Sequence, residues 1–102
     1  MLIVTGIIRV ESEGELASVT AALVKRALKS RQDDGNIDYA FSISVEDPCE
    51  IRLVEKWESE EMLHAHLQIP DEEFNSAMAA TKIKSAVVVS NEVSSETELL
   101  NR

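Results

Sequence analysis

The sequence predicts one α+β domain whose elements follow the order β-α-β-β-α-β. Apolar, β-branched runs stand near both ends of the chain, at Leu2–Val10 and Ile83–Val93. Between these runs lie two stretches with helical periodicity, and between those stretches lies a pair of alternating segments typical of a β-hairpin. A chain of 102 residues has the length of a single domain.

The first strand, Leu2–Val10, is apolar without strict alternation, which is typical of a strand covered on both faces. Ser12 fits the N-cap of a helix, and Glu15 stands where a capping box places the acid that reaches back. The apolar spacing then predicts a helix to about Ser30. Gly35 follows in an Asp-Asp-Gly-Asn turn and is expected to adopt a left-handed conformation.

A hairpin is predicted from Asp38–Val45 and Glu50–Trp57, joined by a turn around Pro48. In the first strand the aromatic and branched side chains share one face: Tyr39, Phe41, Ile43 and Val45. In the second strand one face carries a carboxylate among apolar groups: Ile51, Leu53, Glu55 and Trp57. The pattern does not decide whether this face meets the helices or the bare side of the sheet.

Ser59 is the expected N-cap of the next helix, which runs to about Gln68 and is interrupted by Pro70. A second helical piece is predicted from Asp71 to about Lys82, before the last strand. The final residues are polar, so we expect a domain at 1–93 and a tail at 94–102.

This order is that of the ferredoxin-like split βαβ fold, with both helical segments on one face of a four-stranded antiparallel sheet. The first and last strands are apolar on both sides, so the other face would expose a hydrophobic patch. The simplest way to cover this patch is a homodimer in which two sheets pack face to face. A membrane or a partner protein is the weaker alternative.

Composition excludes several classes of function. The net charge of −9 disfavours nucleic acid and anionic membranes as partners. No apolar run reaches the roughly 20 residues of a membrane helix, and no signal peptide is evident, so a cytoplasmic location is expected. Cys49 is the only cysteine, which excludes an internal disulfide and a cysteine-based zinc cluster. We interpret Cys49 as an incidental thiol in a turn.

Both histidines lie in the second helix, and helical projection separates them. His66 falls in the apolar arc, whereas His64 falls on the opposite, solvent side, so no metal site is predicted. An inward histidine is more often a bonded core residue than a catalyst, although an acid/base role in a partly dry pocket is the functional alternative. Trp57, Tyr39 and Glu55 have the same two interpretations, packing or pocket lining.

The sequence resembles the antibiotic biosynthesis monooxygenase (ABM) superfamily of dimeric α+β barrels. Three segments carry the resemblance, which covers roughly residues 1–93: Gly35–Tyr39, Glu55–Ser59 and His64–Leu67. The resemblance implies a homodimer, and a pocket between sheet and helices in each subunit. Some members are cofactor-free oxygenases in which a deprotonated phenol or quinol supplies the electrons to O2. By position it suggests His66 as the catalytic residue, with Trp57, Tyr39 and Asn36 binding the substrate.

Other members of the superfamily degrade haem with an asparagine in the first strand, and this first strand has none. The leading hypothesis is therefore a cofactor-independent monooxygenase that acts on a phenolic or quinol-type aromatic, without metal or cofactor. The alternatives are a non-catalytic dimer that binds a small ligand and an O2-independent isomerase of the same fold that uses His66 and Glu55.

Overall fold

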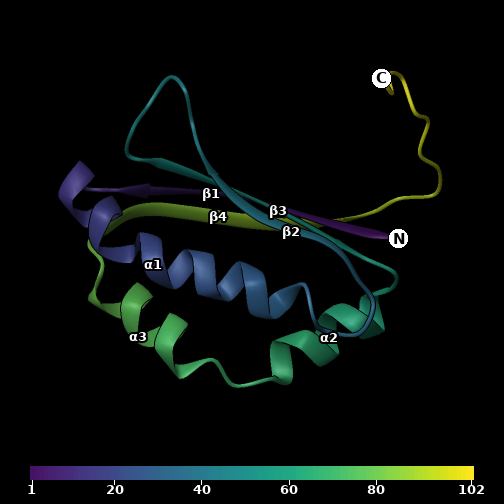
Figure 1. Ribbon diagram of the computed structural model, residues 1–102, viewed down its shortest axis with the longest axis horizontal. Coiled ribbons are helices and arrows are strands. Elements are labelled where there is room, and N and C mark those ends of the chain that lie inside the picture. Colours follow the sequence, from purple (N-terminus) through teal and green to yellow (C-terminus); the bar gives the residue numbers. More distant parts are fainter.

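The structure is a computed structural model that describes residues 1–102. Its elements occur in an order that matches the predicted one, with the second helical segment split in two. They are β1 (Leu2–Val10), α1 (Glu13–Ser30), β2 (Asn36–Ile43), β3 (Glu50–Trp57), α2 (Glu60–Gln68), α3 (Glu72–Ala80) and β4 (Ile83–Glu92). The three helices lie on one face of the sheet, and the C-terminal segment leaves on the opposite side (Figure 1).

The four strands form one antiparallel sheet in the order β2-β3-β1-β4. The first strand of the sequence thus lies inside the sheet, paired with β3 on one side and β4 on the other. Its burial nevertheless alternates: Leu2, Val4, Ile8 and Val10 are buried beneath the helices, whereas Ile3 and Ile7 on the other face are only partly buried. The α+β class and the ferredoxin-like arrangement predicted from the sequence are confirmed.

Helix α1 begins as predicted at Ser12, whose hydroxyl accepts a hydrogen bond of 3.2 Å from the backbone N–H of Glu15. The second bond of a capping box, from the Ser12 backbone N–H to the Glu15 carboxylate, is replaced by a longer-range one. The Glu15 carboxylate accepts a bond of 3.0 Å from the backbone N–H of Lys82, at the start of β4. The acid that was expected to close a local cap therefore ties the helix start to the last strand.

The hairpin is shorter at its turn than the alternation predicted, because β2 ends at Ile43. Its partner strand begins at Glu50, so the residues beyond Ile43 have no continuous ladder to join. Val45, which the alternation placed in this strand on the face of Tyr39 and Phe41, lies beyond the end of β2 and is fully exposed. At the other end β2 begins earlier than predicted, at Asn36, with a register shift before Asp38.

The predicted helix interruption at Pro70 is confirmed as a break between α2 and α3. Asp71 serves as the N-cap of α3, its carboxylate accepting a 3.2 Å bond from the backbone N–H of Phe74. Ser59 caps α2 in the same way through a 3.3 Å bond from Met62. Two separately capped helices follow from this sequence, since proline cannot supply the backbone donor that one continuous helix needs.

The helices do not cover the sheet evenly. The core consists of two neighbouring apolar clusters between α1 and strands β1 to β3, whereas β4 contributes no buried residue. Val88 pairs with Gly6 on the helix side of the sheet and is still 53% exposed. On the other face Val54, Val87 and Val89 are also exposed, which leaves the bare apolar surface that the sequence predicted.

Candidate functional site

Three of the predicted site residues converge in one packed cluster. Trp57 ends β3, Tyr39 lies in β2, and His66 projects from α2 toward both. The ring centroids of His66 lie 4.6 Å from Trp57 and 5.8 Å from Tyr39. All three side chains are buried, with exposed fractions of 0% for Trp57, 3% for Tyr39 and 2% for His66.

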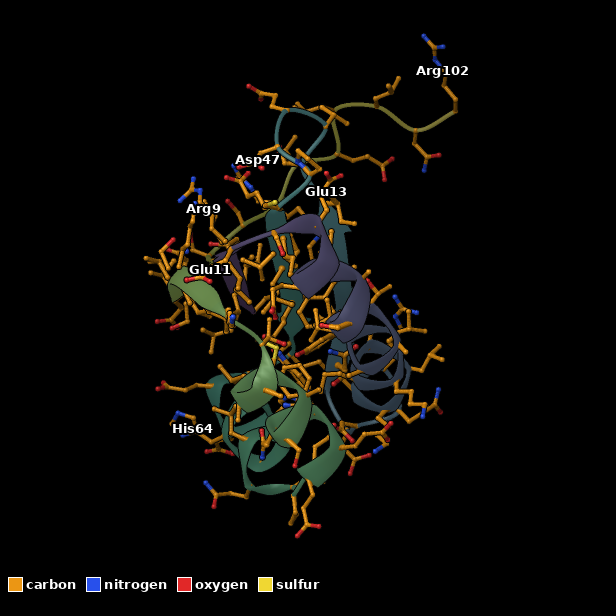
Figure 2. All side chains as sticks on the ribbon, turned by 90° about the vertical axis from the view of Figure 1, so that its left-hand side faces the viewer. Arg9, Glu11, Glu13, Asp47, His64 and Arg102 are labelled. Carbon is orange, nitrogen blue, oxygen red and sulfur yellow. The ribbon has the colours of Figure 1, made fainter.

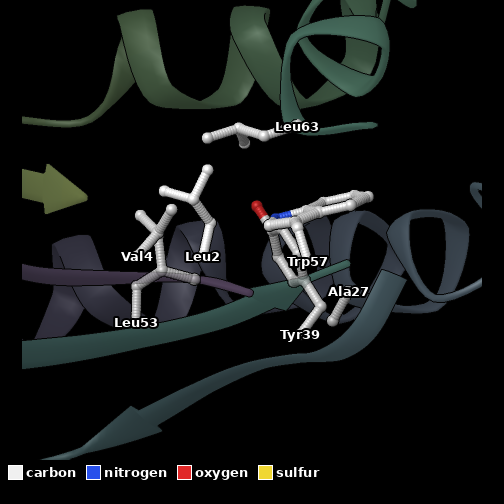
Figure 3. Packing of buried hydrophobic residues seen from close by; sticks show 7 residues of the cluster. All are labelled: Leu2, Val4, Ala27, Tyr39, Leu53, Trp57 and Leu63. Atoms are coloured by element: carbon white, nitrogen blue, oxygen red, sulfur yellow. The ribbon is translucent and has the colours of Figure 1, made fainter. Parts of the chain in front are cut away.

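The apolar neighbours come from every layer of the fold. Figure 3 shows Leu63 of α2 on one side of the cluster and the sheet residues Leu2, Val4 and Leu53 on the other. A tryptophan without exposed surface is a major source of burial energy in so small a domain. The cluster therefore contributes to the core as well as to the candidate site.

Glu55 lies on the helix side of the sheet, which settles the orientation that the sequence left open. Its carboxylate accepts a 2.9 Å hydrogen bond from the Trp57 indole N–H. Burial raises the pKa of Glu55 above its usual carboxyl value, although the Trp57 donor and the Arg26 guanidinium oppose this effect. Burial also raises the pKa of Tyr39, and the negative charge of Glu55 adds to the rise. The site thus holds two acidic groups that resist ionisation.

The predicted division of the two histidines is confirmed. His64, which is labelled in Figure 2, has a side chain that is 65% exposed and lies 3.7 Å from Glu60. His66 uses both ring nitrogens inside the protein. Its Nδ1 lies 2.6 Å from Oδ2 of Asp33, and its Nε2 lies 3.0 Å from a guanidinium nitrogen of Arg26.

Arg26 belongs to an ion network that the sequence analysis did not find. Its guanidinium lies 3.3 Å from Asp71 and 5.0 Å from the centre of the Phe74 ring. Lys29 lies 3.5 Å from the same Asp71 carboxylate. Burial alone would raise the pKa of Asp71, but the Phe74 backbone N–H, the Arg26 bond and the Lys29 charge together hold it below its usual value. The available signal was the position of Arg26 one helical turn before Ser30, on the border of the apolar stripe.

Asn36 stands apart from the three clustered residues. Its amide donates to the backbone carbonyls of Asp38, at 3.1 Å, and Lys56, at 3.4 Å. These bonds hold the register shift at the start of β2. Cys49 lies in the hairpin turn as a half-buried free thiol, and its backbone N–H donates to Asp47 at 2.9 Å.

An apolar groove lies between α1 and the β2 edge of the sheet. It encloses ≈ 200 Å³ and is lined by 11 residues, eight of them hydrophobic. The lining consists of Leu16, Thr20, Leu23, Val24, Ala27, Leu28, Arg31, Phe41, Ser42, Ile43 and Ile51. None of the four predicted site residues lines this groove. It reaches the cluster indirectly, because Phe41 packs edge-on against Tyr39 at 5.7 Å and Arg31 donates to the Tyr39 carbonyl at 2.9 Å.

The site therefore has two parts with different properties. The buried cluster holds an oriented imidazole, a phenol and a carboxylate, which are groups able to move a proton. The groove holds space for an apolar ring and only three polar side chains. No three His, Cys, Asp or Glu side chains gather in a metal-binding arrangement. None of the helices combines the length and apolar character needed to cross a bilayer.

An α+β domain with this element order and this antiparallel strand order belongs to the class of ferredoxin-like folds. The family profile for antibiotic biosynthesis monooxygenase matches residues 1–79. The chain belongs to this family.

Solved structures with the same fold extend the comparison. A "putative antibiotic biosynthesis monooxygenase" from Deinococcus radiodurans is 23% identical, with a TM-score of 0.87 over 99% of this chain and 100% of its own. A protein of the same description from Nitrosomonas europaea is 17% identical, with a TM-score of 0.82 over 93% and 100%. A protein from Mycobacterium tuberculosis is 17% identical, with a TM-score of 0.76 over 96% and 100%. A search of functionally curated proteins finds no match.

Proposed function

We propose that the protein is a cofactor-independent monooxygenase whose substrate is a phenolic or quinol-type aromatic. The observation that carries this proposal is the convergence of His66, Trp57 and Tyr39 in one cluster of a chain that belongs to the monooxygenase family. His66 is the proposed acid/base, and Trp57 and Tyr39 hold the substrate ring. Asn36 supports the strand end on which Trp57 lies.

The chemistry needs no electron donor besides the substrate. A phenol that loses its proton becomes electron-rich enough to reduce O2, so that one oxygen atom enters the ring and the other leaves as water. The phenol is oxidised to a quinone in the same step. The protein's contribution is to remove the proton and to exclude bulk water, and the buried cluster supplies the groups for both.

Oxygen consumption tests the role of His66. A panel of quinols is incubated with the wild type, His66→Gln and His64→Gln, and O2 uptake is followed. Loss of a positioned acid/base lowers the rate by about 10²–10⁴-fold, so we expect this loss in His66→Gln. The exposed His64 lies in the same helix and is the matched control. Unchanged uptake by a folded His66→Gln protein would remove His66 from the mechanism.

A second function, non-catalytic binding of a small apolar ligand, is favoured by the groove. The hollow lies outside the cluster, and both nitrogens of His66 are already bonded within the protein. A thermal-shift screen of aromatic ligands, followed by analysis of the recovered compound, separates the two functions. A binder is stabilised by a ligand that is recovered unchanged, whereas an oxygenase converts it.

We further propose that the bare face of the sheet pairs with a second copy of the chain. The exposed valines of this face flank the central strand β1: Val54 lies on β3, and Val87 and Val89 lie on the edge strand β4. A charge placed among them, as in Val87→Asp, is expected to shift the protein from dimer to monomer in analytical ultracentrifugation. The exposed Val45→Asp in the hairpin turn is the control, and a monomeric wild type would contradict this pairing.

A further inference from the structure

Three side chains from different parts of the chain lie in a row through the imidazole of His66. Asp33, in the turn after α1, meets Nδ1 at 2.6 Å. Arg26, in the last third of α1, meets Nε2 at 3.0 Å. The contacts span 33 and 40 residues of sequence, so only the folded chain assembles them. The row therefore couples the end of α1 to α2 through one histidine.

The row fixes the protonation state of His66 by the chemistry of its partners. A guanidinium can only donate hydrogen bonds, so Nε2 must accept and carries no proton. Nδ1 then carries the ring proton and donates it to the Asp33 carboxylate. The imidazole is thus neutral, in the tautomer whose Nε2 lone pair is the basic one. Glu55, Tyr39 and Asp71 are the other titratable groups around this unit.

The hydrogen-bonding capacity of Arg26 is not exhausted by these contacts. Its Nε is buried and has no partner, and one of its other nitrogens meets Asp71 at 3.3 Å. Its guanidinium lies over the Phe74 ring, which leaves a flat cation against an aromatic face. A buried donor without a partner is unusual in a folded protein and is suited to an acceptor brought in by a ligand. A phenolate oxygen is such an acceptor, and its negative charge suits the guanidinium.

We propose that Asp33, His66 and Arg26 form one phenol-activating unit, in which Asp33 is a positioning residue and Arg26 binds the phenolate. This inference rests on the proposed function and assigns its proton transfer. The phenol displaces the guanidinium from Nε2, and its O–H bond breaks as the proton passes to Nε2. The imidazolium keeps its bond to Asp33, and the negative charge left on the phenol oxygen is balanced by Arg26.

Nitrogen-15 NMR of the imidazole rings tests the role of Asp33 without any turnover. The chain has only two histidines, and the exposed His64 serves as the internal reference. In the wild type we expect His66 to carry its proton on Nδ1. Asp33→Ala should move the proton from Nδ1 to Nε2 in a large share of the molecules, and Asp33→Asn, which keeps an acceptor, should retain it on Nδ1. The exposed Asp34→Ala, in the same turn, is the control. A proton on Nε2 in the wild type would overturn the proposal.

Binding of 4-nitrophenol tests the role of Arg26, because its phenolate absorbs visible light and its phenol does not. The compound is titrated with protein at a pH where most of the free form is protonated. We expect the wild type and Lys25→Met to induce the phenolate band, Arg26→Met to lose at least nine-tenths of it, and Arg26→Lys to retain part. Equal bands, or none, in wild type and a folded Arg26→Met protein would overturn the proposal. A normal tautomer and phenolate band without O2 uptake on any quinol would instead contradict the monooxygenase function alone.

Discussion

The cluster beneath α2 and the groove beside α1 lie in one small domain and divide two properties between them. The cluster contains the oriented imidazole and the buried carboxylate and has little contact with solvent. The groove offers space and apolar walls, but Arg31 is its one charged side chain. Reactive groups and room for a ligand are therefore next to each other without being in the same place.

Because of this difference, we expect substitutions in the cluster to affect mainly stability and substitutions in the groove to affect mainly ligand binding. A sealed aromatic cluster supports the fold, so substitutions there cost folding free energy before they affect any reaction. The groove is formed partly by exposed side chains, so its residues can change with little effect on folding. The following predictions test this separation, from the largest expected effect on stability to the smallest.

Replacement of Trp57 is expected to have the largest effect. Trp57→Ala should lower the free energy of unfolding by about 3–5 kcal/mol, because it empties a site with no exposed surface. Trp57→Phe keeps most of the packing but leaves the Glu55 carboxylate without its donor, at a cost of about 1–3 kcal/mol. Urea unfolding measures both. A loss below about 1 kcal/mol for Trp57→Ala would show that the cluster does not hold the fold together.

Gly35 tests the turn that brings Asp33 to His66. Its φ of +79° disfavours any other residue, and an added Cβ would overlap the Met62 side chain. Gly35→Ala should therefore cost more than about 1 kcal/mol. Gly14→Ala, in the first turn of α1, is the control: its added Cβ would lie 3.6 Å from the Ser12 hydroxyl oxygen, an ordinary contact, and the substitution should stabilise the protein by up to about 1 kcal/mol. Equal unfolding free energies for the two variants would contradict this view of the turn.

The pH dependence of stability tests whether the Glu55 carboxylate is shielded from water. Burial raises its pKa in the folded protein above the usual value of 4.5, so the folded state holds this proton more tightly than the unfolded state. The resulting stabilisation is complete below the unfolded pKa and is lost as the pH rises through the raised folded pKa. As the pH rises from below 4.5 through the raised folded-state pKa, wild type should thus lose Tm relative to Glu55→Gln. The exposed Glu58→Gln is the control. If Tm depended on pH in the same way in wild type and Glu55→Gln, the Glu55 carboxylate would be well solvated.

Substitutions in the groove should affect ligand affinity more than folding stability, unlike substitutions in the cluster. Leu28 is 55% exposed, so Leu28→Ser should change the unfolding free energy by no more than about 0.5 kcal/mol. Removal of its apolar surface from the groove should weaken an aromatic ligand found by thermal shift about tenfold, which corresponds to about 1.4 kcal/mol. Leu100→Ser in the exposed C-terminal segment is the control. Unchanged affinity in titration calorimetry would place the ligand elsewhere.

Much of this arrangement could be predicted from residue patterns with a short range. Caps at Ser12 and Ser59, the left-handed Gly35 and the break at Pro70 are local effects of single residues, and all are present. The inward direction of His66 followed from helical spacing alone. The roles predicted for His66, Trp57, Tyr39 and Asn36 stay predictions, since geometry alone does not test them.

The partners of these residues could not be predicted in the same way. Asp33 lies in the Asp-Asp-Gly-Asn turn and Arg26 lies late in the first helix, and neither position by itself indicates a contact with a histidine. Their contacts with His66 depend on how α2 packs against the end of α1, which no local spacing encodes. Alternation likewise could not decide which side of the sheet carries the Glu55 side chain, because it divides a strand into two faces without indicating which face meets the helices.

The interior position of β1 has a consequence for the kinetics of folding. Its hydrogen-bond partners are residues 50–57 on one side and 83–92 on the other, so the sheet joins sequence segments that are far apart. Such non-local pairing raises the contact order and slows folding relative to a helical bundle of similar size. During synthesis β1 emerges before either partner, and one of its two edges stays unpaired until β4 is available. In this domain the last strand completes the first.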